Sequence, residues 1–210
     1  MKANNNSNNT DDTSSRDSYY FDTADLVIIA LFAALGGISS SFIGTITRSI
    51  FQPLGLPGFG QIVAGIHIFW YIIAFLLTNR KIGAVTLTGT IKGCVELFSG
   101  SSLGILALFI SFFSAVLFEI IYFTIKFSTT SSQIQTHGIS LAGGFASASN
   151  VVIQIETFLQ MSSNNDFPTE WIFIIFLLAF ISGVCFGYLG LLFHYEFEKT
   201  GILGWRKSIK

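Results

Sequence analysis

Two charged residues close together inside an apolar segment are the first candidates for chemistry in this sequence. Lys92 and Glu96 are four residues apart, so on a helix they share one face and can form an ion pair that lowers the cost of burying both charges. Glu119 lies in another apolar run with no cation nearby. Because an ionisable group inside a membrane costs about 3 kcal/mol or more unless it is paired or hydrated, each of the three is a candidate ligand contact. The alternatives are a structural ion pair for the first two residues and a hydrogen-bonded carboxyl for Glu119.

A stripe of polar residues between positions 139 and 159 is the second candidate group. Alternating four- and three-residue spacing places its members on one face of a helix: Gly143, Ser147, Asn150, Gln154 and Thr157. Asn and Gln side chains bridge helices inside membranes, and they also supply the few polar groups that orient a small ligand in an apolar pocket. Both interpretations fit Asn150 and Gln154.

Aromatic residues near position 70 form the third group. Trp70 has a ring suited to stacking on a flat or cationic ligand, and packing in the core explains it equally well. His67 stands alone, and the sequence has no cluster of His, Cys and carboxylate residues at metal-ligand spacing. Cys94 and Cys185 lie in apolar runs, where cysteine behaves as a small hydrophobic residue. We therefore predict no bound metal and no other cofactor.

The composition indicates which elements must position these residues. Of the 210 residues, 51% are hydrophobic and only 11% are charged, against about 25% charged in soluble domains. A soluble protein of this size would leave large apolar patches in water. Helices of about 20 apolar residues cross a bilayer, whereas membrane strands alternate over about ten. The sequence predicts an all-α integral membrane protein, a bundle of six transmembrane helices at Leu26–Ile46, Gln61–Thr78, Ile82–Phe98, Leu103–Ile125, Ile139–Leu159 and Trp171–Phe193.

The distribution of Lys and Arg predicts the orientation of this bundle. With the N-terminus inside, nine basic residues lie in the inner regions and only Arg48 lies in an outer connection. Cytoplasmic connections carry such an excess, so both termini are predicted to be cytoplasmic, in the cell (plasma) membrane. The polar residues 1–22 are predicted to form a disordered tail, residues 23–198 the membrane domain, and residues 199–210 a basic cytoplasmic tail.

Small residues spaced four apart predict where helices approach each other closely. Three segments carry such pairs, namely Ala30 and Ala34, Gly89 and Gly93, and Gly183 and Gly187. Packing within the bundle explains each pair, but the first lies on a terminal helix and equally suits a partner protein. The connection Thr47–Gly60 combines two prolines and three glycines with apolar side chains. It predicts a lid that folds over the outer face of the bundle.

Several function classes lack their sequence signatures. No phosphate-binding G-x-x-x-x-G-K-[ST] loop is present, so any use of ATP must come from another protein. The formal net charge is −1, which leaves no basic surplus to neutralise the phosphates of a nucleic acid. No nucleophile–base pair is evident. The sequence therefore favours neither an enzyme, nor a primary pump, nor a nucleic-acid-binding protein.

The pattern of six helices, the Ala30/Ala34 pair and the apolar lid resembles the substrate-binding (S) component of energy-coupling factor (ECF) vitamin transporters. More narrowly, three stretches are similar to S components of the YkoE type, which serve thiamine or its hydroxymethylpyrimidine precursor. These stretches are the turn Asn79–Ala84, the block from Val95–Gly100 to Ala115–Glu119, and Ile181–Gly183 leading into Thr200–Leu203. The resemblance covers most of residues 23–204.

This resemblance implies a chain that captures thiamine or hydroxymethylpyrimidine from outside and performs no chemistry itself. Ala30 and Ala34 match the motif that docks on a transmembrane T subunit, which two ABC ATPases drive. Glu96 and Glu119 match acidic positions of the family, and Gln154 falls where a polar ligand contact is expected. Together with the candidates above, the predicted substrate site consists of Trp70, Lys92, Glu96, Glu119, Asn150 and Gln154.

Lys92 departs from the picture of a cationic ligand, because a cation beside Glu96 neutralises it. Neutral hydroxymethylpyrimidine or another heterocycle is therefore an alternative substrate. One alternative is an S component for a different vitamin, favoured if Lys92 pairs with a substrate carboxylate. Another is a non-transporting membrane scaffold in which Lys92, Glu96 and Glu119 only hold helices together. An intramembrane enzyme is a remote third alternative.

Overall fold

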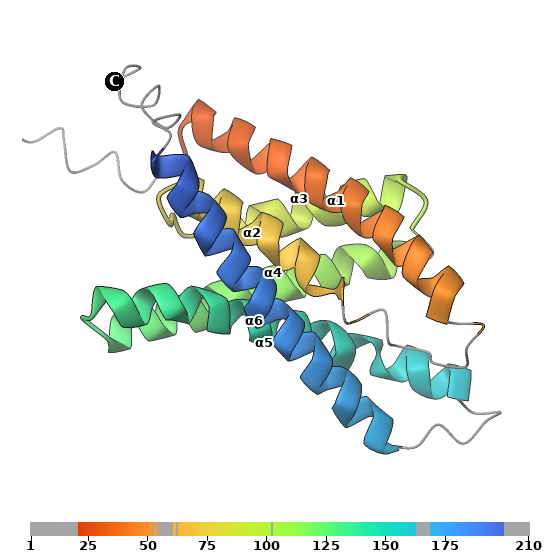
Figure 1. Ribbon diagram of the computed structural model, residues 1–210. Helices are drawn as coiled ribbons and strands as arrows, with labels where there is room; N and C mark the ends of the chain where they lie inside the picture. Colours follow the sequence, from red (N-terminus) through yellow and green to blue (C-terminus); the bar gives the residue numbers. More distant parts are fainter. Residues whose placement is uncertain are drawn as a thin grey trace, which may run out of the picture.

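The computed structural model describes residues 21–51, 53, 61, 63–101, 103–162 and 169–199, and the statements below concern these residues. They form six helices packed in a bundle (Figure 1), which confirms the all-α prediction. The predicted tails, residues 1–22 and 199–210, lie almost entirely outside the described residues. The helices are α1 (Thr23–Phe51), α2 (Gly65–Leu77), α3 (Ala84–Phe98), α4 (Ile105–Ser128), α5 (Ser132–Ser162) and α6 (Thr169–Lys199).

The helices run alternately up and down, so the bundle has two ends. We call the end where α1 begins and α6 ends the near end; it lies at the left in Figure 1 and includes the α2–α3 and α4–α5 connections. The far end is where α1, α3 and α5 end. Helix α6 packs against α5 and α2, α3 packs against α4 and α1, and α4 packs against α5.

Most helix boundaries differ from the sequence prediction by a few residues, and α6 continues to Lys199 rather than ending at Phe193. Helix α5 begins at Ser132 rather than Ile139, because its first two turns are polar and escape a search for apolar runs. Helix α1 continues to Phe51, so the first residues of the predicted lid, Thr47–Phe51, are helical. Most of the remaining lid lies outside the described residues.

Close contacts at glycines hold the helices together. A Cβ atom on Gly93 would lie 2.8 Å from Leu108 Cα of α4, and a Cβ atom on Gly183 would lie 2.5 Å from the Gly143 carbonyl oxygen of α5. Real Cβ atoms do not tolerate such distances, so these crossings require glycine. The small-residue pairs on α3 and α6 are therefore packing faces inside the bundle.

The near end is fixed by an ion pair between distant parts of the chain. Lys81, in the α2–α3 connection, lies 2.7 Å from the Asp25 carboxylate at the start of α1, and the Asp25 side chain is fully buried. The backbone N–H of Asp22 also donates to this carboxylate. The connection itself turns sharply, with positive φ angles of 57° at Asn79 and 56° at Arg80, which are uncommon for residues other than glycine. These contacts tie the first turn of α1 to α2 and α3.

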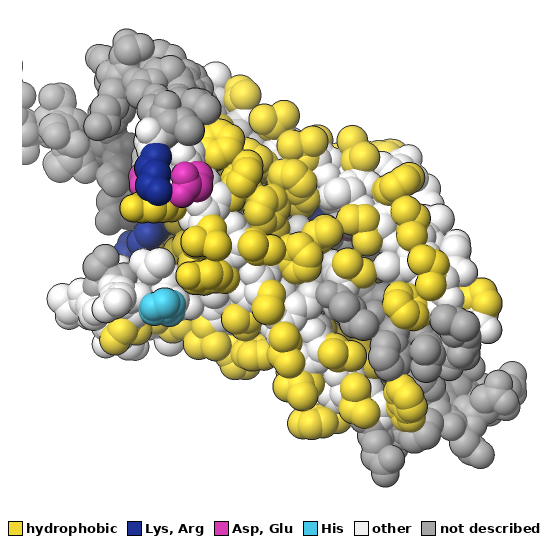
Figure 2. Space-filling view, viewed as in Figure 1, with side chains coloured by type: hydrophobic (Ala, Val, Ile, Leu, Met, Phe, Trp, Pro, Cys, Tyr) yellow, Lys and Arg dark blue, Asp and Glu magenta, His cyan; other side chains and the backbone are white. Residues whose placement is uncertain are grey.

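The exterior of the bundle is largely apolar, as a membrane protein requires. Figure 2 shows hydrophobic side chains across one face and charged side chains gathered mainly at the near end. Among the described residues, three helices are long and apolar enough to cross a bilayer: Thr23–Phe51, Ile105–Ser128 and Trp171–Lys199. Helix α2 is apolar but has only 13 residues, and α3 contains Lys92 and Glu96. Six complete spans and the orientation of the termini therefore stay predictions.

Candidate functional site

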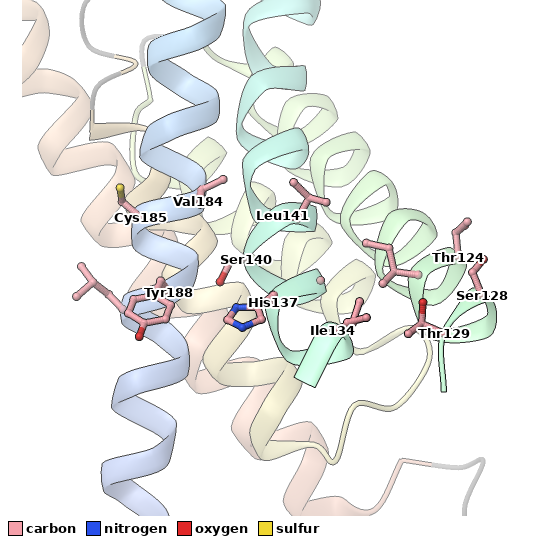
Figure 3. A pocket seen from close by; sticks show the side chains of 13 residues that line it. Thr124, Ser128, Thr129, Ile134, His137, Ser140, Leu141, Val184, Cys185 and Tyr188 are labelled. Atoms are coloured by element: carbon pink, nitrogen blue, oxygen red, sulfur yellow. The ribbon is translucent and has the colours of Figure 1, made fainter. Parts of the chain in front are cut away.

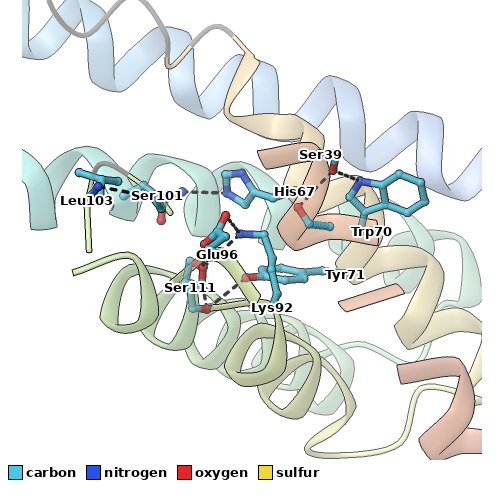
Figure 4. Close-up of polar contacts among 12 residues, drawn as sticks. Ser39, His67, Trp70, Tyr71, Lys92, Glu96, Ser101, Leu103 and Ser111 are labelled. Carbon is cyan, nitrogen blue, oxygen red and sulfur yellow. Dashed lines mark hydrogen bonds and ion pairs between the residues drawn. The ribbon is translucent and has the colours of Figure 1, made fainter. Parts of the chain in front are cut away.

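A buried ion pair lies at the centre of the far half of the bundle (Figure 4). Lys92 Nζ is 2.6 Å from Glu96 Oε1, and the two side chains are 3% and 10% exposed. Ser111 of α4 donates its hydroxyl to Glu96 Oε2 at 2.9 Å and accepts from Lys92 Nζ at 3.1 Å. Tyr71 of α2 donates to the Ser111 carbonyl oxygen at 3.2 Å. The pair within one helix that the spacing predicts is confirmed, and it carries no net charge.

The packing of α1 and α4 on α3 explains why this pair is buried. Because Gly93 lets α4 approach closely, Ser111, one turn beyond Leu108, reaches the Glu96 carboxylate. On the other side, a Cβ atom on Gly37 of α1 would lie 2.6 Å from Val95 Cγ1 and 3.1 Å from the Lys92 carbonyl oxygen. Helix α1 therefore packs closely on the helix that carries the ion pair, with glycine at the point of contact.

Polar side chains of α2 and α5 meet beside the ion pair. The Asn150 amide nitrogen donates to His67 Nε2 at 2.8 Å, and the His67 ring lies edge-on to Tyr71 with ring centroids 6.0 Å apart. Farther toward the far end, Gln61 Nε2 lies 3.5 Å from Gln154 Oε1. Asn150 and Gln154 of the α5 stripe thus meet polar side chains of α2 and of the segment before it, whereas Gly143 and Ser147 of the same stripe lie against Gly183 of α6. We call Gln61, His67, Tyr71, Lys92, Glu96, Ser111, Ser147, Asn150 and Gln154 the far-half polar cluster.

Three polar atoms of this cluster are buried without a hydrogen-bond partner in the described structure. They are Asn150 Oδ1, Gln61 Oε1 and Ser147 Oγ. Asn150 and Ser147 are 3% and 0% exposed. Leaving such a group unsatisfied costs about 1–3 kcal/mol, so a hydrogen bond to any of these atoms would be favourable. Two of the three, the amide oxygens, are acceptors only.

Trp70 points toward α1, away from the ion pair (Figure 4). Its indole N–H donates to the Ser39 hydroxyl of α1 at 2.9 Å, and its ring packs 6.0 Å from that of Phe32, also on α1. This arrangement matches the second interpretation of Trp70 given above, packing in the core. Trp70 links α1 to the helix that carries His67 and Tyr71.

Glu119 lies at the near end, where it caps the N-terminus of α3. Its carboxylate accepts backbone N–H bonds from Gly83 at 3.1 Å, Val85 at 2.7 Å and Thr86 at 3.2 Å, and it accepts the Thr86 hydroxyl at 2.9 Å. A negative charge at a helix N-terminus satisfies unpaired N–H groups and the helix dipole. These bonds occupy both carboxylate oxygens. The geometry therefore matches the alternative stated above, a hydrogen-bonded carboxyl, and we leave Glu119 out of the proposed ligand contacts.

A substitution separates the capping role of Glu119 from a ligand role. We expect Glu119→Ala to lower stability by about 2 kcal/mol, because four donors lose a charged acceptor, while ligand affinity of the folded protein stays unchanged. Thr86→Val, which removes one of the four bonds, should cost less than half as much. Thermal unfolding and ligand titration of the detergent-purified variants measure both effects. A folded Glu119→Ala protein that has lost ligand affinity would contradict the capping account.

The two neighbouring small-residue rows of α1 differ in burial. Ala33 and Gly37 are buried against the bundle, whereas Ala30 is exposed and Ala34 is half-buried. Large apolar neighbours of Ala30 and Ala34 are also exposed, with Leu31 at 54%. The predicted docking pair therefore lies at the edge of an exposed, apolar surface of α1, with Ala30 exposed and Ala34 partly covered by the bundle.

Several contacts were missed by reasoning from sequence. Asp25 and Ser111 were not singled out, although a serine in an apolar helix and an acid close to a basic turn are signals that could have suggested them. No group of three or more His, Cys, Asp or Glu side chains arranged for a metal ion occurs among the described residues.

Comparison with known proteins gives two matches. A family model described as "ABC-type cobalt transport system, permease component" matches residues 24–149. A solved structure described as "Crystal structure of an S-component of ECF transporter" aligns with a TM-score of 0.72 over 88% of this chain and 89% of that chain, at 19% sequence identity. The search of curated proteins gave no match. The chain is a membrane protein that belongs to the family of ABC-type cobalt transport system permease components and has the fold of an ECF transporter S component.

Proposed function

We propose that this chain is the substrate-binding S component of an ECF-type importer in the plasma membrane, and that it captures hydroxymethylpyrimidine or thiamine. The observation that carries the proposal is the far-half polar cluster, in which buried hydrogen-bonding atoms lack partners inside a bundle with the S-component fold. The protein itself performs no chemistry. ATP hydrolysis belongs to partner subunits.

The chemistry of the cluster favours a neutral heterocycle with N–H donors. Lys92 and Glu96 cancel each other's charge and share Ser111, so the site presents no free charge to an ionic ligand. The unpaired amide oxygens of Asn150 and Gln61 accept hydrogen bonds. An aminopyrimidine supplies donors to such oxygens and a flat ring that fits between apolar helices. Within the proposal, hydroxymethylpyrimidine is therefore preferred to cationic thiamine.

A cobalt ion is the second candidate substrate, because the description of the matched family names cobalt transport. Divalent transition metals prefer several imidazole, thiolate or carboxylate ligands. Around Asn150, the described residues offer His67 as an imidazole, while both oxygens of Glu96 are already bonded. The donor set thus fits an organic ligand better than a metal ion.

Within this proposal, α1 is the helix that docks on the T subunit. Ala30 and Ala34 form a small-residue surface on the outside of the bundle, which lets a helix of a T subunit approach closely. The inner face of the same helix covers Lys92 through Gly37, and Trp70 ties it to α2. With the near end cytoplasmic, the far-half polar cluster lies in the outer half of the membrane, where a vitamin arrives.

Uptake measurements test the proposed function. We expect cells that produce the chain with a T subunit and two ABC ATPases to accumulate labelled hydroxymethylpyrimidine in an ATP-dependent manner. Ala34→Leu should abolish co-purification with the T subunit and uptake without lowering ligand affinity, because a larger side chain blocks close helix approach. Leu31→Ile, a change of similar position without added volume, is the matched control. If neither cobalt nor any of the tested vitamins were taken up in an ATP-dependent manner, the importer would be contradicted. Full uptake by Ala34→Leu would contradict the docking surface.

A further inference from the structure

A groove at the near end lies outside the far-half polar cluster and has no role in the proposed function. It has a volume of about 1000 Å³ and lies between α4, α5 and α6 (Figure 3). Apolar side chains of all three helices form most of its walls, among them Ile125, Leu141 and Val184. Because α4 and α6 are long and apolar enough to span a bilayer, the groove opens toward lipid rather than toward water.

Polar groups are concentrated in one part of this groove. Ser128 and Thr129, at the end of α4, and His137, in the second turn of α5, border its near-end portion. Ser140, one turn deeper on α5, is 6% exposed, and its hydroxyl has no hydrogen-bond partner in the described structure. Hydroxyl and imidazole donors bind phosphate oxygens, and a buried hydroxyl pairs with an ester carbonyl. From the near end inward, the groove therefore offers polar groups suited to a phosphate, then a hydroxyl suited to an ester carbonyl, and then apolar walls suited to a hydrocarbon chain.

The groove fits within one leaflet of the membrane. From Ile134 to Leu141, the first and last α5 residues that line the groove, the axis of α5 rises by about 10 Å, and half the hydrocarbon thickness of a bilayer is about 15 Å. Lys126, exposed in the last turn of α4, adds a positive charge at the near end, which attracts anionic headgroups. An acyl chain is the natural occupant of such a groove, because water there would lose hydrogen bonds.

We propose that the groove between α4, α5 and α6 is a binding site for one anionic phospholipid of the near-end leaflet. Its phosphate contacts Ser128, Thr129 and His137, an ester carbonyl accepts the Ser140 hydroxyl, and one acyl chain lies against Leu141 and Val184. The site does not depend on which substrate the protein transports.

Native mass spectrometry of the full chain tests this site. The protein is stripped of lipid in detergent and then offered phosphatidylglycerol or diacylglycerol with the same acyl chains. We expect one phosphatidylglycerol to be retained per chain and diacylglycerol to be retained less. Cys185 is exposed, lines the groove and forms no disulfide. Cys185→Trp should lower retention about tenfold by excluding about two methylene groups.

Leu177→Trp is the matched control, because Leu177 is 47% exposed on the same helix and does not line the groove. It should retain lipid like the wild type, and both Trp variants should unfold at the wild-type temperature. His137→Leu should reduce the preference for phosphatidylglycerol over diacylglycerol. Equal retention by the two Trp variants would overturn the site, and equal retention of the two lipids by the wild type would overturn the phosphate contact. Lost binding of a T subunit by Cys185→Trp with lipid retention intact would show a protein interface instead.

Discussion

Replacing Lys92 by Met is expected to destabilise the protein by about 3–5 kcal/mol, the usual cost of removing one partner from a buried ion pair. Glu96 would keep only the Ser111 hydroxyl at 2.9 Å, in a position that is 10% exposed. For a chain of this length the loss corresponds to a fall of about 10 °C or more in the unfolding temperature. Thermal unfolding of the purified variant measures it directly.

The double variant Lys92→Met/Glu96→Gln distinguishes a lost charge partner from lost packing. It removes both charges while nearly preserving volume, so most of the stability should return. Lys199→Met is the matched surface control, because Lys199 pairs with Glu196 while its side chain is 53% exposed, and such pairs contribute little. A single Lys92→Met variant as stable as the wild type would contradict the buried ion pair.

Gly183→Val is expected to separate α5 from α6. A Cβ atom at this position would lie 2.5 Å from the Gly143 carbonyl oxygen and 2.6 Å from Ser147 Cβ. Backbone cannot move aside as a flexible side chain can, so the helices must part, at a cost of about 3 kcal/mol or more. We expect low yield, an unfolding temperature far below that of the wild type, and loss of ligand binding because Asn150 lies farther along the same face of α5.

Gly44→Val provides the control for a change of glycine to valine within a helix. A Cβ atom on Gly44 of α1 would meet no atom within 4 Å, so this variant should fold and bind ligand like the wild type. If Gly183→Val unfolded at the same temperature as Gly44→Val, the close crossing of α5 and α6 would be wrong.

Local patterns in the sequence predict the helices and the contacts within them. Apolar runs located all six helices, and a spacing of four residues identified the ion pair of Lys92 and Glu96. The start of α5 was placed seven residues too late, because Ser132 and its polar neighbours are helical without being apolar. Hydropathy detects burial in lipid, whereas helix formation also depends on the hydrogen bonds of the preceding turn.

Contacts between distant residues are what the sequence did not predict. Glu119 caps a helix that begins 35 residues earlier in the chain, and Asn150 meets His67 across 83 positions. Neither pairing has a periodic signature, since both depend on how the helices cross. Trp70 shows the same limit. Its aromatic ring suited stacking on a ligand, but the packing of α1 directs its N–H to Ser39.

The central claim is that the far-half polar cluster binds a small heterocycle, and calorimetric titration tests it most directly. The detergent-purified protein is titrated with hydroxymethylpyrimidine, thiamine and cobalt chloride, alongside Asn150→Leu and the control Ser149→Ala, whose hydroxyl only bonds its own helix. We predict binding of hydroxymethylpyrimidine, weakened about tenfold or more by Asn150→Leu through the loss of buried hydrogen bonds and unchanged in Ser149→Ala. The account would be contradicted if the protein bound cobalt but neither hydroxymethylpyrimidine nor thiamine. It would also be contradicted if Asn150→Leu bound hydroxymethylpyrimidine as tightly as the wild type.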